Sequence, residues 1–148
     1  MVRRAYRLLT LPRRERHVVV RALATYARVR WRLWRGGLAG VQRLQSNPSP
    51  TDRRGGQSRL QPRDVARLVA GALRPLGANC LGESLTLALL LQRLDYPASL
   101  RIGARRAHAG LEAHAWVELD GVPLNDRLDI ASDYSPFADQ TEAETPFV

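Results

Sequence analysis

The chain lacks the residues on which several protein classes depend. Among its 148 residues there is no lysine and only one cysteine, Cys80. A single cysteine cannot form an internal disulfide, and it excludes a metal cluster built on cysteines. The longest apolar run, residues 85–91, contains a threonine and is far shorter than the ~20 residues of a membrane-spanning helix. These absences exclude a disulfide-rich secreted scaffold and a transmembrane bundle.

The remaining composition is that of an ordinary globular protein. Hydrophobic residues make up 45% of the chain and charged residues 25%, values that suit one compact domain of this length. The N-terminus is rich in arginine, as a signal peptide would be, but arginines at positions 13, 14, 16 and 21 interrupt any apolar segment. We therefore expect a cytoplasmic protein.

The positive charge is confined to the N-terminal half. Residues 1–76 contain 18 arginines and three acidic residues, a net charge of +15, whereas residues 77–148 contain five arginines and 11 acidic residues, a net charge of −6. The formal net charge of +9 therefore does not describe a uniformly basic surface. Coding bias explains a lysine-free chain more simply than phosphate recognition does, so nucleic acid is not the favoured partner.

The N-terminal half has the periodicity of an amphipathic helix. From residue 12 to residue 34, apolar side chains recur at three- and four-residue steps, arginines occupy the opposite face, and Gly36-Gly37 ends the pattern. The apolar stripe consists of Val20, Leu23, Ala27, Trp31 and Trp34. We expect this basic helix to pack on the domain through the stripe; a docking surface for an acidic partner is the alternative.

A polar, proline-containing stretch separates this helix from the rest of the chain. It predicts a division into a basic amphipathic helical arm at 1–44, a linker or mobile loop at 45–61, a catalytic core at 62–137 and an acidic tail at 138–148.

The core is predicted to begin with helices and to end with a sheet. Helices are expected over residues 62–74 and from about residue 79 to 94, and leucines almost all round the second helix predict a central, buried position. Short alternating stretches then predict strands over residues 99–103, 113–119 and 122–126. The expected fold class is therefore α+β, with N-terminal helices followed by a small antiparallel sheet.

Cys80 stands where the second core helix is predicted to begin, directly after Gly77-Ala78-Asn79. The positive end of a helix stabilises a thiolate, which is the nucleophilic form of cysteine. The backbone amides of the first turn, including that of Cys80, are candidate donors to the oxyanion of an attacked carbonyl. Cys80 is therefore a candidate nucleophile.

Such a nucleophile needs a base, and the chain contains three histidines. His17 lies in the basic helix and His108 in a stretch predicted to be a loop, whereas His114 begins a strand, which would hold its ring more rigidly. Trp116 is two residues further along the same face of that strand. We consider it a candidate to shield the base or to line a substrate groove, and core packing explains it equally well.

The Asp120-Gly121 hairpin is expected to select the third member of the site. A two-residue turn places His114 opposite Arg127, which cannot orient a protonated imidazole. A three-residue loop with Gly121 in the left-handed bulge position places His114 directly opposite Asp126, within hydrogen-bonding reach. We therefore expect the three-residue loop, with Asp126 as the group that orients the imidazole.

Several segments in order resemble the lasso-peptide leader peptidases, a transglutaminase-like family. The resemblance covers roughly residues 62–137, and a basic helical N-terminus is also similar. The segments that carry it are Cys80-Leu81-Gly82-Glu83-Ser84-Leu85, Arg93, Leu100-Arg101-Ile102-Gly103, Ala113-His114-Ala115-Trp116-Val117-Glu118 and Asp120-Gly121-Val122-Pro123-Leu124-Asn125-Asp126.

The resemblance implies a papain-like cysteine protease core on a transglutaminase-like fold. It implies that Cys80 is the nucleophile, His114 the base and Asp126 its orienting group, with no cofactor and no metal. The implied reaction removes the leader from a ribosomally made precursor peptide, so that a separate ATP-using cyclase can close a macrolactam. Because the first 60 residues have no room for a recognition domain, a separate leader-binding protein is the other implied partner.

Two other functions remain open at the level of sequence. Acyl transfer to an amine instead of water would make the chain a transglutaminase-like, amide-forming enzyme. A basic adaptor with an inert cysteine would instead bind an acidic protein or nucleic acid through its +15 half.

Overall fold

The computed structural model describes residues 11–45, 60–108 and 110–136, so most of the expected linker and the whole expected tail lie outside the described residues. The elements in chain order are α2 (Arg13–Gln45), α3 (Pro62–Leu73), the 3₁₀ turn η1 (Arg74–Leu76), α4 (Cys80–Arg93), β1 (Ser99–Ala107), β2 (Gly110–Leu119), β3 (Val122–Pro123), α5 (Ile130–Asp133) and β4 (Ser135–Pro136). The sheet has the order β3-β2-β1-β4 and is antiparallel throughout. The α+β class with helices before an antiparallel sheet is confirmed. Within these ranges no helix combines the length and apolarity needed to cross a bilayer.

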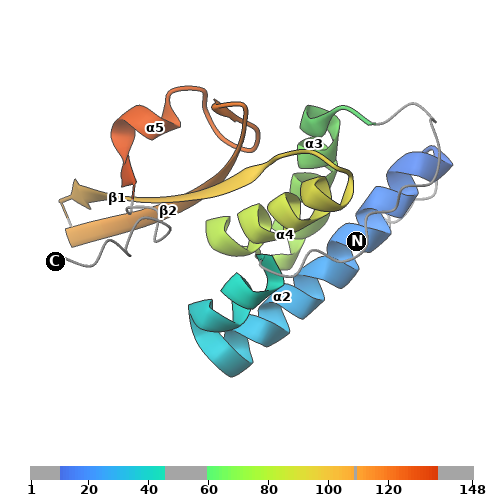
Figure 1. Cartoon of the computed structure of the whole chain (residues 1–148), viewed down its shortest axis with the longest axis horizontal. Coiled ribbons are helices and arrows are strands. Elements are labelled where there is room, and N and C mark those ends of the chain that lie inside the picture. The colour runs from blue at the N-terminus through green and yellow to red at the C-terminus, as the bar shows by residue number, and fades with distance from the viewer. Residues whose placement is uncertain (1–10, 46–59, 109, 137–148) are drawn as a thin grey trace, which may run out of the picture.

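α4 occupies the centre of the molecule, where it contacts α2, α3, β1 and β2 (Figure 1). Every residue from position 82 to position 91 is buried, which confirms the central helix expected from its leucines. A single core joins these elements, since Ala22 of α2, Val69 of α3, Leu87 of α4 and Val117 of β2 all belong to it.

α2 packs on this core through a different face from the one expected. Its buried residues are Val19, Ala22, Thr25, Tyr26 and Val29. The expected stripe faces solvent instead, with exposed fractions of 64% at Val20, 36% at Leu23, 51% at Trp31 and 81% at Trp34. The expectation that this stripe packs inward is therefore wrong.

Shape explains which face of α2 is buried. The ring of Tyr26 lies 3.0 Å from the point where a Cβ on Gly82 would stand, so the glycine on α4 lets this face of α2 approach closely. At its other end, α2 leaves helical geometry at Gly37 (φ 56°, ψ −152°), where the glycine pair predicted an end. Helix then resumes as far as Gln45.

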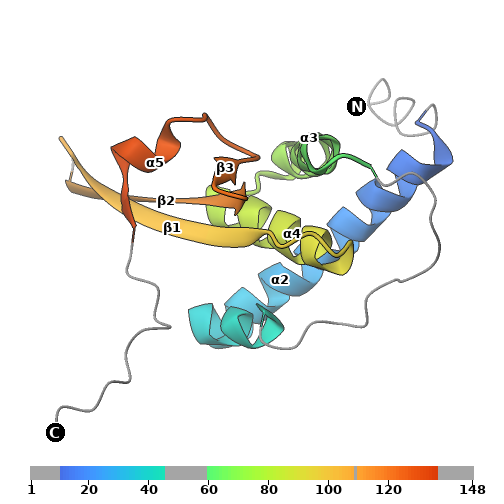
Figure 2. The ribbon, with the colours of Figure 1, turned by 45° about the horizontal axis from the view of Figure 1, so that its top comes forward.

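The β1–β2 hairpin is longer than expected. The stretch between residues 103 and 113 is predicted to be a loop, yet β1 and β2 pair continuously out to Ala107 and Gly110. The cross-strand partners Arg105 and Glu112 form a salt bridge of 2.9 Å, which supports the extension where hydrophobic alternation is weak. Figure 2 shows α5 lying over the part of the hairpin that extends beyond the helices.

The turn between β2 and β3 also differs from the expectation. Leu119 pairs directly with Val122, so the turn has two residues and the expected three-residue loop is wrong. Both turn residues have positive φ, 51° at Asp120 and 77° at Gly121. Such turns match the right-handed twist of the strands that they join, which favours them over longer loops.

Candidate active site

Asp126 lies beside His114 although the two residues are not cross-strand partners. The strand expected over residues 122–126 ends with β3, so their expected pairing across the sheet does not occur. Strand pairing stops here because a side chain takes the place of the backbone. In a continued ladder, the N–H of Val117 would donate to the next backbone carbonyl, but it donates instead to Oδ1 of Asn125 at 2.9 Å. The chain then leaves the sheet, and Asp126 reaches the imidazole.

The contact between His114 and Asp126 is direct and partly sheltered from solvent. Nε2 of His114 lies 2.5 Å from Oδ2 of Asp126, and 23% and 21% of the two side chains are exposed. The N–H of Arg127 donates to the other carboxylate oxygen at 2.8 Å. In the tautomer that donates an Nε2–H to this carboxylate, the neutral ring keeps its lone pair on Nδ1, the nitrogen that can then act as a base.

A buried chain of hydrogen bonds ties α4 to the same corner of the sheet. Oγ of Ser84 donates to the carbonyl of Ala115 at 2.9 Å and accepts from Nδ2 of Asn125 at 2.9 Å. Ser84 has no exposed surface and Ala115 is 3% exposed. Since a fully satisfied buried network holds its members in one arrangement, it fixes α4, β2 and the loop after β3 relative to one another.

Cys80 is the first residue of α4. Oδ1 of Asn79 caps the helix by accepting the N–H of Gly82 at 2.8 Å, and the Asn79 carbonyl accepts the N–H of Glu83 at 3.0 Å. The amides of Cys80 and Leu81 are first-turn donors that an α-helix does not use itself. The partly exposed cysteine therefore stands beside backbone donors at the positive end of a helix.

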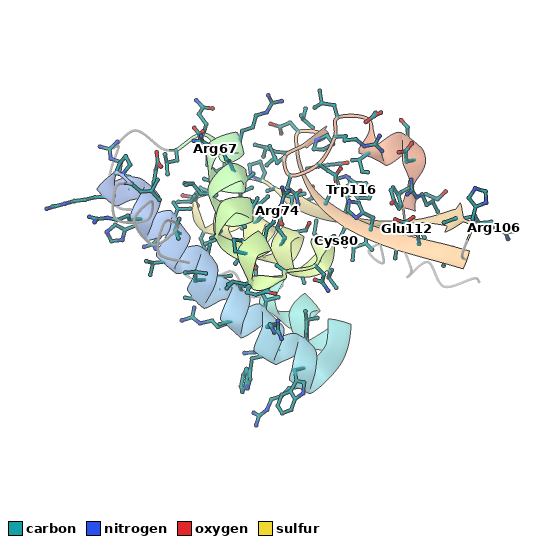
Figure 3. The ribbon with its side chains drawn as sticks, turned by 180° about the vertical axis from the view of Figure 1, so that it is seen from behind. Arg67, Arg74, Cys80, Arg106, Glu112 and Trp116 are labelled. Atoms are coloured by element: carbon teal, nitrogen blue, oxygen red, sulfur yellow. The ribbon has the colours of Figure 1, made fainter. Side chains whose placement is uncertain are left out.

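α4 and β2 pack together so that their N-terminal parts, which carry Cys80 and His114, lie toward the same end of the pair. The second half of α4 packs with Val117 in the core, and the bond from Ser84 to Ala115 lies nearer the N-terminus of both elements. Figure 3 shows Cys80 at the end of α4 that faces the sheet. In the described part of the chain no hydrogen bond joins the Cys80 thiol to the imidazole; such bonds are often long before substrate binds.

Trp116 lies behind the imidazole. The ring centroids of His114 and Trp116 are 6.3 Å apart with planes inclined by 22°, and only 2% of Trp116 is exposed. Its indole N–H donates to Oε1 of Glu118 at 2.8 Å, and Arg101 binds the other oxygen of that carboxylate at 3.1 Å. With so little free surface, Trp116 packs beside the imidazole in this structure and does not line an open groove.

The other two histidines lie elsewhere. His17 is exposed on α2, and His108 is exposed at the tip of the β1–β2 hairpin. Among the described residues, no group of three or more histidine, cysteine, aspartate or glutamate side chains is arranged to hold a metal ion.

Sequence reasoning missed three residues of this region. Ser84, Asn125 and Tyr134 were given no role there. The position of Ser84, one helical turn after Cys80, was the available signal, because residues four apart share one face of a helix. Nothing in the local sequence indicates that Tyr134 lies 5.3 Å from His114.

The fold and the site together define an α+β protein in which a helix beginning with cysteine abuts an antiparallel sheet carrying a His–Asp pair. A family model described as the transglutaminase-like superfamily matches residues 19–139. The chain therefore belongs to the transglutaminase-like superfamily, whose fold is typical of cysteine proteases and acyltransferases. No curated protein and no solved structure matched the chain. The match includes most of α2, in agreement with the packing of this helix in the common core.

Proposed function

We propose that this protein is a cysteine peptidase that removes the leader from a ribosomally synthesised lasso-peptide precursor before a separate cyclase closes the macrolactam. The observation that carries the chemistry is the 2.5 Å contact of Nε2 of His114 with Asp126, on a strand that packs against the helix beginning with Cys80. The lasso-peptide substrate is supported by the ordered sequence segments, and the superfamily match supports the cysteine-based chemistry. The proposal keeps the cytoplasmic location expected from the sequence.

In the proposed mechanism, Nδ1 of His114 takes the thiol proton, and the thiolate of Cys80 attacks the carbonyl carbon that joins leader to core. The backbone amide of Cys80 donates to the resulting oxyanion. The protonated imidazole gives its proton to the leaving amine of the core, which leaves the leader as a thioester on Cys80. Water then loses a proton to His114 and hydrolyses the thioester, which releases the leader and restores the thiol.

The exposed face of α2 supports a role for an acidic partner. Trp31 and Trp34 are open to solvent there, and the guanidinium of Arg35 lies 4.6 Å from the Trp31 ring centroid. Burial and the guanidinium groups of Arg28 and Arg21 lower the pKa of Arg93, so positive charges crowd between α2 and the end of α4. We propose that this face docks the leader-binding protein together with an acidic leader.

Mass spectrometry of a lasso-peptide precursor, incubated with this protein and its leader-binding partner, tests the proposed reaction. We expect cleavage at one bond, with the mass of one water added, for the native chain and for the His108→Ala control. Cys80→Ala and His114→Ala should give no product. Incorporation of a supplied amine would favour the acyltransferase alternative, and an active Cys80→Ala variant would refute a cysteine peptidase.

The docking proposal has its own readout. Because charge attraction acts mainly through the association rate and is screened by salt, raising the salt concentration should slow formation of the complex. Trp34→Ala should weaken the complex at every salt concentration. An affinity that does not respond to salt would contradict the docking of an acidic partner on α2.

A further inference from the structure

Two aromatic rings lie close to the imidazole of His114. Tyr134, directly after α5, is only 6% exposed, and its ring centroid lies 5.3 Å from that of His114 with the planes inclined by 34°. The same ring lies 6.3 Å from Trp116. Three aromatic groups therefore form one cluster, and Tyr134 and Trp116 both contact the candidate base.

The space for Tyr134 exists because β1 carries a glycine opposite His114. Gly103 and His114 are cross-strand partners. A Cβ at Gly103 would lie 2.8 Å from Cβ of Tyr134, a distance too short for two carbon atoms, and 3.1 Å from the Trp116 ring, which is a tight contact. The strand pairing that follows, between Gly103 and Pro136 of β4, holds the chain so that Tyr134 occupies this place.

Two charged residues of the hairpin hold the tyrosine from its other end. The hydroxyl of Tyr134 donates to Oε1 of Glu112 at 3.2 Å. Arg105 binds the same carboxylate at 2.9 Å and places its guanidinium 4.8 Å from the centroid of the Tyr134 ring. Arg105 on β1 and Glu112 on β2 (Figure 3, where Glu112 is labelled) therefore hold the Tyr134 ring in its place beside His114.

We infer that Tyr134 is a positioning residue for His114, whose ring holds the imidazole with Nε2 on Asp126 and favours the imidazolium formed when the base takes the thiol proton. The inference rests on the proposed function, because it requires a proton to pass from Cys80 to His114. An aromatic face attracts a neighbouring cation, and an aromatic neighbour also restricts the tilt of the imidazole. Glu112 and Arg105 act through Tyr134.

Charged and titratable groups from several elements lie around His114. These are Asp126 from the loop, Glu112 on β2 and Tyr134 after α5, with Cys80 at the same end of β2 and Arg105 behind Glu112. The hydrogen bond from Arg105 lowers the pKa of Glu112. Burial, and the hydrogen bond to Glu112, raise the pKa of Tyr134. The carboxylate and the neutral phenol therefore both persist across the range in which thiols ionise.

Alkylation of the full-length chain with iodoacetamide measures this effect without any precursor. Cys80 is the only cysteine, so the rate reports one thiol, and only its thiolate reacts. We expect Tyr134→Leu and Tyr134→Met to lower the rate about five- to tenfold at about pH 6, where the thiolate depends on the imidazolium, and to leave it unchanged at about pH 9.5. Tyr134→Phe, which keeps the ring, should retain the wild-type rate at both pH values.

Tyr96→Leu is the matched control, because it removes a different tyrosine, half-buried and at the opposite end of α4. It should lower the unfolding temperature without changing the ratio of the two rates. Two non-aromatic variants at position 134 keep the test possible if one of them fails to fold.

The outcomes separate this inference from the proposed function. Equal rates at about pH 6 for the wild type and both non-aromatic variants would overturn the role of Tyr134, and so would an equal loss at both pH values. If instead His114→Ala matched the wild type at low pH, no imidazolium would support the thiolate. That result would overturn the proposed function and, with it, the inference.

Discussion

The Asn125 amide should be more important to stability than its half-exposed surface position suggests. Its Oδ1 accepts the N–H of Val117 and its Nδ2 donates to Ser84, and both partner residues have no exposed surface. Asn125→Ala removes both bonds at once. Water cannot easily replace them, because the partner groups lie between α4 and the sheet.

The structure sets the expected magnitude. A buried N–H left without an acceptor at Val117 costs about 1–3 kcal/mol, and the lost bond to Ser84 about 0.5–1.5 kcal/mol, so Asn125→Ala should lower the free energy of unfolding by about 1.5–4.5 kcal/mol. For a domain of this size the unfolding temperature should fall by roughly 5–15 °C. Ser84→Ala breaks the same network from the α4 side, so the two changes should not be additive.

Urea unfolding of the two single variants and the double variant measures this coupling. We expect an interaction free energy of about 1 kcal/mol between Asn125 and Ser84. Gln92→Ala, which removes a side-chain amide with one hydrogen bond to the carbonyl of Ala98, is the control and should cost less than about 1.5 kcal/mol. The buried network would be refuted as the element that ends the strand if the stability losses of the Asn125 and Ser84 variants were additive. It would also be refuted if Asn125→Ala cost no more stability than Gln92→Ala.

Three further predictions concern residues around the imidazole. Gly103→Ala should lower the free energy of unfolding by about 1–3 kcal/mol, because the new Cβ would stand 2.8 Å from Tyr134, whereas Gly71→Ala in α3, with open space around it, should not be destabilising in the same urea titration. Glu112→Gln should lower the unfolding temperature at neutral pH but not in strong acid. Arg105 lowers the pKa of Glu112 in the folded state. The stability that the Glu112 carboxylate contributes is therefore complete above its unfolded pKa of about 4.3 and disappears as the pH falls through its folded pKa. Asp126→Asn should leave a folded protein whose precursor cleavage is about 10²–10⁴-fold slower, because the amide cannot stabilise the imidazolium; a cleavage rate near that of the wild type would exclude Asp126 as the orienting group.

Local sequence patterns predicted the elements that depend on local forces. Asn79 caps α4 as a side chain of its type does at a helix start, and the run of leucines after it is buried as expected. The glycine pair breaks helical geometry at Gly37, although helix resumes after it instead of ending there. For the cap and the buried helix, the deciding interactions lie within a few residues of one another or follow from the residue pattern itself, so the sequence was sufficient.

The pairing of His114 with Asp126 shows where this reasoning stops. The sequence pointed to these two residues through a register that the structure does not have. The turn at Asp120-Gly121 follows its own backbone preference, and the side chain of Asn125 then ends the ladder. The contact is present, but it follows from a side-chain hydrogen bond of Asn125 and not from strand pairing.

By itself, the sequence determined the order of the helices and strands, the placement of the lone cysteine at a helix start, and the broad transglutaminase-like family. Only the tertiary structure decided which face of α2 is buried, because both of its stripes are apolar and the close approach of Tyr26 to Gly82 selects one of them. It likewise placed Tyr134 against His114, through a gap left by Gly103 on another strand. Periodicity reports which residues share a face of one element, whereas packing depends on the shapes that distant segments present to each other.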